Sequence, residues 1–189
     1  MSYVDTVNIK GYESKTPAWQ SPRLDASTHS WQVIDYEHHE IHSGSSFVVA
    51  DCTDLGNGAS RELLIVTPNT AKWAHLLVKI ITESEAHWYL YEDATTSSDG
   101  TGLTEVNRNR NSATTATAVV THTPTLTGDG TLIYQEHYGS GRGNGGENRG
   151  ESEFVLKQNA KYLVRLTNAT TSANYVTIVL DWYEHTDAS

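Results

Sequence analysis

The fold is decided by the stretch Asn174-Tyr-Val-Thr-Ile-Val-Leu-Asp-Trp-Tyr-Glu-His185, close to the end of the chain. Every second residue from Val176 to Trp182 is large and apolar, and the residues between them are more mixed in polarity. This period of two predicts a β-strand with one buried face. Residues 161–167 show the same alternation, and the turn-like segment 168–174 separates the two strands. We expect the final strand to lie in the middle of a sheet, because it is long and strongly hydrophobic.

The chain before these strands also reads as short strands separated by turn residues. The predicted strands are 36–42, 46–51, 62–66, 76–82, 87–92, 115–123, 131–138, 153–156, 162–167 and 175–183. A single helical turn near 70–73 is the only helix that the pattern favours. Eight to ten short strands with Gly-rich turns are typical of a sandwich or barrel. Eight core strands with long cross-connections favour a jelly roll. We therefore predict an all-β fold, a jelly-roll-type antiparallel β-sandwich with an extended N-terminal arm.

The predicted arm is residues 1–33, and the predicted sandwich domain is residues 34–189. Aromatic residues are scattered through the arm without a period, among polar residues and two prolines. A disordered tail carries fewer aromatics than this. Two interpretations stay open, an arm that packs on its own domain and an arm that reaches a partner. In the second interpretation Tyr12, Trp19 and Trp31 are the anchors.

Composition excludes several classes of partner. The formal net charge is −10, from 23 acidic and 13 basic residues, which argues against binding to nucleic-acid phosphates and leaves room for docking on a basic surface. Cys52 is the single cysteine, so no disulfide forms within the chain. The N-terminal residues lack an apolar signal core, and no apolar run approaches the roughly 20 residues of a membrane span. We expect a protein made in a reducing cytoplasm, with neither membrane nor nucleic acid among its partners.

Two long polar segments stand out as loops. Residues 93–114 are long enough to form a covering loop. Residues 139–150 contain six glycines in twelve positions, so ordering them carries a large entropic cost. This segment also supplies Arg142 and Arg149, which we predict as further contact residues for a partner.

The sequence offers weak signals for site chemistry. On a strand, His38, Glu40 and His42 share one face and resemble a metal-binding set, but the further Glu and His of a cupin-like site are missing. Residues 93–100 lack the alternating acids of a calcium loop. The chain has no Gly-x-Ser-x-Gly motif, and Cys52 has no basic neighbour in sequence. We predict no enzyme, no cofactor and no metal.

The segment His87-Trp-Tyr-Leu-Tyr91 allows two interpretations. Trp88, Tyr89 and Tyr91 can form a stacking platform for a sugar. Alternating aromatics on a sheet are more often core on one side and rim on the other.

Several stretches carry a family resemblance. They include Glu40-Ile-His-Ser-Gly-Ser-Ser-Phe47, Glu62-Leu-Leu-Ile-Val-Thr-Pro68, 102–112, 123–131, and 156–162 through Asp181-Trp-Tyr-Glu-His185. In these stretches residues 34–187 resemble small virion proteins encoded beside the capsid genes of tailed bacteriophages. Such proteins, where their role is known, are head decoration or cement proteins with jelly-roll folds, commonly trimers over threefold or quasi-threefold positions.

The resemblance implies a structural virion protein on the capsid surface, present in the host cytoplasm during assembly. Its implied partners are the major capsid protein and itself, as a homotrimer. Its role would be to stabilise the head by bridging capsomers. Because similar genes also encode collar and tail components, the alternative is a carbohydrate-binding or adhesion module of a phage head or tail.

Overall fold

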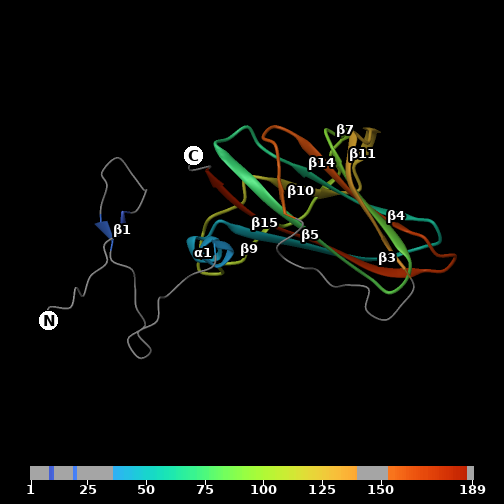
Figure 1. Ribbon diagram of the computed structural model, residues 1–189. Coiled ribbons are helices and arrows are strands. Elements are labelled where there is room, and N and C mark those ends of the chain that lie inside the picture. Colours follow the sequence, from blue (N-terminus) through green and yellow to red (C-terminus); the bar gives the residue numbers. More distant parts are fainter. Residues whose placement is uncertain (1–8, 11–18, 21–35, 140–152, 187–189) are drawn as a thin grey trace, which may run out of the picture. The chain divides into compact units, whose positions relative to one another are not determined.

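The computed structural model describes residues 9–10, 19–20, 36–139 and 153–186 (Figure 1). The chain divides into two units, Met1–His39 and Glu40–Ser189. In the first unit, β1 (Ile9–Lys10) and β2 (Trp19–Gln20) form an antiparallel pair. Helix α1 (Tyr36–Ser43) spans the boundary between the two units.

Two antiparallel sheets dominate the second unit (Figure 1). The six-stranded sheet has the order β12 (Thr131–Tyr138), β6 (Ala86–Glu92), β14 (Lys161–Asn168), β4 (Ser60–Val66), β10 (Val119–His122) and β8 (Thr101–Gly102). The five-stranded sheet has the order β13 (Phe154–Val155), β5 (Lys72–Thr82), β15 (Asn174–Thr186), β3 (Ser46–Leu55) and β9 (Val106–Asn107).

The chain passes back and forth between these sheets, except that β6 and β12 both lie in the six-stranded one. Strands β3, β5, β13 and β15 lie in the five-stranded sheet, while β4, β6, β12 and β14 lie in the six-stranded one. In each sheet a late strand lies between two early ones, β15 between β5 and β3, and β14 between β6 and β4. The prediction that the last strand is central is therefore confirmed.

The core lies between the two sheets and is formed by alternate residues of their strands. From β15 it takes Val176, Ile178, Leu180 and Trp182, each at most 3% exposed. The six-stranded sheet contributes the inward residues of β14, such as Val164, to the same cluster. The period of two in the sequence thus places one face of each strand in the core, as predicted, and the fold is an all-β sandwich.

The connection between β6 and β12 extends and covers the sandwich. Its strands β8 and β10 lengthen the six-stranded sheet beyond β4, and β9 pairs with β3 of the other sheet. Strands β7 (Thr95–Ser98) and β11 (Thr125–Gly128) form a separate two-stranded ribbon. Leu126 of this ribbon packs with Ala94 against Leu64 and Leu163, which point away from the main core. The polar stretch 93–114, predicted as a covering loop, therefore carries short strands.

Buried Glu184 of β15 forms hydrogen bonds with the segment that connects β6 to β12. Its carboxylate accepts hydrogen bonds from the Thr117 amide and hydroxyl, the Ala118 amide and Trp182 Nε1, at 2.6–3.0 Å. A buried carboxylate needs such donors, because burial without them is costly. The connection is thus tied to the inner face of the five-stranded sheet.

Two predictions of local structure are wrong. Residues 36–42 form helix α1 instead of a strand. The helix ends at Gly44, which has φ 79° and whose backbone amide donates a hydrogen bond to the Ile41 carbonyl oxygen. The turn expected near 70–73 is wrong too, since β5 begins at Lys72 and Trp73 pairs with His185. There the ladder with β15 outweighs local helical propensity. Each of the other nine predicted strands coincides with an observed strand, 131–138 with the same bounds and the other eight with shifted ends.

Candidate functional site

The residues predicted to bind a partner lie mostly outside the described part of the chain. Tyr12, Trp31, Arg142 and Arg149 belong to the segments that are not described. Trp19 is in β2, where only the backbone is described. Their role stays a prediction, so the candidate site must be sought on the sandwich.

The outer face of the five-stranded sheet carries an array of apolar side chains. We call it the β15 face and define it by seven outward residues in the middle of the sheet, Ala50, Cys52, Lys79, Ile81, Tyr175, Thr177 and Val179, of which Lys79 and Thr177 are polar. The outward acids Asp54 and Asp181 border it. Ile81 and Cys52 flank Thr177, and Lys79 and Ala50 flank Val179. Ile81 is 43% exposed and Tyr175 is 54% exposed. Because the alternate residues of the same strands fill the core, these side chains are held in fixed rows.

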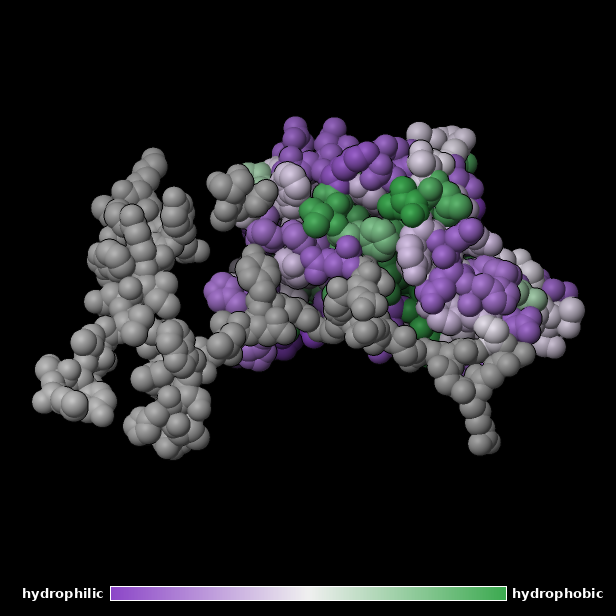
Figure 2. Space-filling view, in the orientation of Figure 1, coloured by the Kyte–Doolittle hydropathy of each residue, from purple (hydrophilic) through white to green (hydrophobic). Residues whose placement is uncertain are grey.

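Exposed hydrophobic residues gather into a patch on the surface of the molecule. Figure 2 shows such residues in the middle of the face turned to the viewer, with hydrophilic residues around them. Contiguous apolar patches on a soluble domain mark interaction surfaces, whereas single exposed apolar residues are normal. The β15 face meets this criterion, since Val179 lies directly opposite Ala50 and Ile81 lies diagonally across from both Tyr175 and Val179.

The outer face of the six-stranded sheet is built around Arg165. Its guanidinium donates to both Asp129 oxygens at 2.6 and 2.7 Å and to Glu62 at 2.7 Å. It also lies 5.4 Å from the centre of the Tyr91 ring. Hydrogen bonding to Arg165 holds the pKa of Asp129 below its usual range, and the bond to Asp129 raises the pKa of Arg165. This cluster is internally satisfied and stiffens the face.

The aromatic segment of β6 is split between the two sides of the sheet. Trp88 lies in the core at 4% exposure, so the predicted platform of Trp88, Tyr89 and Tyr91 does not form. His87, Tyr89 and Tyr91 form a row on the outer face, with ring centres 6.4 and 6.1 Å apart. His137 of β12 faces His87, with their Nδ1 atoms 2.8 Å apart. The reading of core on one side and rim on the other is confirmed.

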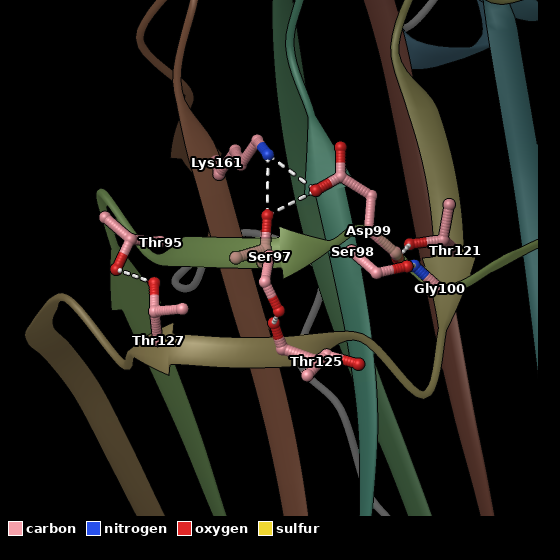
Figure 3. Close-up of polar contacts among 10 residues, drawn as sticks. Thr95, Ser97, Ser98, Asp99, Gly100, Thr121, Thr125, Thr127 and Lys161 are labelled. Atoms are coloured by element: carbon pink, nitrogen blue, oxygen red, sulfur yellow. Dashed lines mark hydrogen bonds and ion pairs between the residues drawn. The ribbon is translucent and has the colours of Figure 1, made fainter.

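Polar side chains on and beside the ribbon of β7 and β11 form hydrogen bonds with one another and with Lys161 of β14 (Figure 3). Lys161 donates to Asp99 at 2.5 Å and to Thr96 at 2.8 Å, and Thr127 donates to Thr95 at 2.9 Å. The hydrogen bond from Lys161 is the main cause that lowers the pKa of Asp99. The Asp99 carboxylate is thus paired with the ammonium group of Lys161.

The candidate metal set near α1 is also rearranged. On a helix, residues two positions apart point in different directions, so Glu40 does not share a face with His38 and His42. Glu40 is buried at 5% exposure, and its carboxylate accepts hydrogen bonds from Ser43 and Ser45. The shared face predicted for these three residues is wrong. Within the described ranges, no three or more His, Cys, Asp and Glu residues gather in a group that could hold a metal ion.

Comparisons with protein-family models, with curated proteins and with solved structures gave no match. None of the helices in the described ranges is long and apolar enough to cross a membrane.

Proposed function

We propose that this protein is a capsid decoration protein of a tailed-phage head, which binds the outer surface of the capsid and stabilises it by bridging capsomers. The sandwich would be a jelly roll. The strand order supports this, because the eight principal strands interleave early and late strands in both sheets, as two Greek keys do. The sequence resemblance points the same way.

The observation that carries the proposal is the apolar β15 face. Its rows are presented by central strands of a rigid sheet, so docking on it requires little ordering. The opposite outer face is partly covered by the β7–β11 ribbon and by the Arg165 cluster. We therefore place the contact with the major capsid protein on the β15 face. The net charge of −10 favours a basic surface on the capsid.

The arm and the glycine-rich segment would add contacts around this face. Tyr12, Trp19 and Trp31 would anchor the arm, and Arg142 and Arg149 would add charged contacts. Self-association into a homotrimer would strengthen attachment, because once one subunit is bound the binding of the other two becomes intramolecular. The proposed location is the virion surface, with the protein in the host cytoplasm during assembly.

Binding to capsids that lack this protein tests the proposal. The full-length chain and a variant without residues 1–33 are mixed with undecorated heads, and bound copies are located by image reconstruction. We expect saturable binding of the full chain at threefold positions, greater heat resistance of the heads, and weaker binding of the shortened chain. Failure of the full chain to bind at micromolar concentration would contradict the proposed function.

The aromatic row on β6 favours carbohydrate recognition as a second candidate. Tyr89 and His87 present rings on an outer sheet face, the arrangement that sugar stacking uses. An isolated domain that binds a glycan, and loses it in Tyr89→Ala but not in Tyr175→Ala, would favour this function over decoration.

A further inference from the structure

Two imidazoles face each other near the edge of the five-stranded sheet where β13 pairs with β5. His75 lies on β5 and His185 on β15, and they are diagonal neighbours because Tyr183 is the residue directly opposite His75. Their Nε2 atoms are 2.8 Å apart, and their ring centres are 4.5 Å apart. The β5–β15 register thus brings together two ring nitrogens from distant parts of the chain.

The other nitrogen of each ring has an oxygen partner that only accepts. His75 Nδ1 is 2.6 Å from the carboxylate oxygen Oε1 of Glu153, and His185 Nδ1 is 3.0 Å from the Thr186 carbonyl oxygen. Because both partners only accept, we assign the proton of each neutral ring to Nδ1. In the neutral rings two Nε2 lone pairs then lie within 2.8 Å of each other. This arrangement is repulsive unless a cation lies between the two nitrogens.

The surroundings hold the His75 ring in place. The Tyr183 hydroxyl donates to the same Glu153 oxygen at 2.7 Å, and the Tyr183 ring stacks on His75 with centres 4.5 Å apart and planes at 16°. The His75 side chain is 15% exposed, so these contacts hold the ring while a small part of it stays accessible to solvent. A carboxylate on the far nitrogen of a histidine is the usual outer partner of a metal-binding imidazole.

We propose that His75 and His185 bind a transition-metal dication through their Nε2 atoms, with Glu153 as a positioning residue and water completing the coordination. Two nitrogens that are each about 2.0 Å from one ion lie about 2.8 Å apart when the angle at the ion is about 90°. The site therefore suits the square-planar preference of Cu²⁺ or Ni²⁺. Tetrahedral Zn²⁺ requires the nitrogens to separate by about 0.5 Å. The excess of acidic residues over basic ones attracts cations to the protein.

The test uses the full-length chain without an affinity tag, first treated with a chelator and then dialysed. Isothermal titration with Ni²⁺ and Cu²⁺ should show one strong site per chain. His75→Gln and His185→Gln should each abolish it, and Glu153→Gln should weaken it about 10- to 100-fold. Electron paramagnetic resonance of the Cu²⁺ complex should show two nitrogen ligands in the native chain and fewer in each histidine variant.

A second histidine pair provides the matched control. The Nδ1 atoms of His87 and His137 are also 2.8 Å apart, but this contact lies on an exposed face of the six-stranded sheet. The variant with His87→Gln and His137→Gln should keep the strong site. Loss of binding in this control, or its persistence in His75→Gln, would overturn the proposal. If a chain that melts normally shows no strong metal site, the cation between the two Nε2 atoms is a proton. This result would also refute the proposal. Neither result bears on capsid binding, so the two proposals fail separately.

Discussion

Tyr175 provides the sharpest test of the β15 face. Its side chain is 54% exposed on β15, beside the Asp54 position of β3. An aromatic side chain presents roughly 150–250 Å², so a partner can cover about 80–135 Å² of Tyr175. At about 25 cal/mol per Å² this area contributes up to about 2–3 kcal/mol to binding. Tyr175→Ala should therefore weaken attachment to undecorated capsids by about 30- to 150-fold per site.

The fold should tolerate this change, because exposed positions usually alter stability by less than about 0.5 kcal/mol. Val119→Ala is the matched control, since Val119 is 49% exposed but lies on β10 of the other sheet. Both variants are compared with the native chain by co-sedimentation with heads over a concentration series, and by thermal melting. If Tyr175→Ala binds as tightly as Val119→Ala, the β15 face is not the docking surface.

Three further predictions concern stability and its dependence on pH. The hydrogen bond from Arg165 lowers the pKa of Asp129 in the folded state. The ionised Asp129 therefore stabilises the fold fully above about pH 4, and this stabilisation is lost as the pH falls through the lowered pKa. Asp129→Asn should therefore flatten the acid side of a plot of melting temperature against pH, and an unchanged slope would argue against the pair. Glu184→Gln should cost about 1.5–3 kcal/mol in chemical denaturation, because the amide cannot accept all the buried hydrogen bonds. Gly130→Ala should cost about 1–3 kcal/mol in the same assay, since φ is 89° and a Cβ would meet the Glu92 carbonyl; a melting temperature equal to that of the native chain would contradict this.

The strands were predictable because burial on one face leaves a period of two in the sequence. Val176 and Ile178 show this on β15, and the inward side of β6 shows it as well. In β6, Trp88 alternates in step with the apolar residues Ala86 and Leu90, so the period of two already places Trp88 on the core side. The sugar platform failed because it combined residues of both parities. This part of the candidate site could have been corrected from the sequence alone.

Other features depend on contacts that no local pattern records. The residues of α1 are polar enough to suit either a solvated strand or a short helix, and the buried carboxylate of Glu40 accepts hydrogen bonds from Ser43 and Ser45. The pairing of His75 with His185 requires the register of β5 against β15, which joins residues 110 positions apart. The capping of Glu184 by the Thr117 amide likewise spans 67 positions. Sequence reasoning missed both because neither partner is unusual by itself.

The two sheets differ in how their outer faces are used, and this difference orients the molecule. On the six-stranded sheet, Leu64 and Leu163 are sealed by the ribbon, and Arg165 neutralises two acids beside Tyr91. On the five-stranded sheet, Ile81 keeps close to half of its surface exposed. Exposed apolar residues occur on both sheets, since Val119 of β10 is 49% exposed. On the five-stranded sheet, Ile81 and Tyr175 lie diagonally across two central strands, on the side of the sheet that does not face the core. The arrangement of these side chains supports the proposed attachment through the β15 face, with the ribbon turned outward.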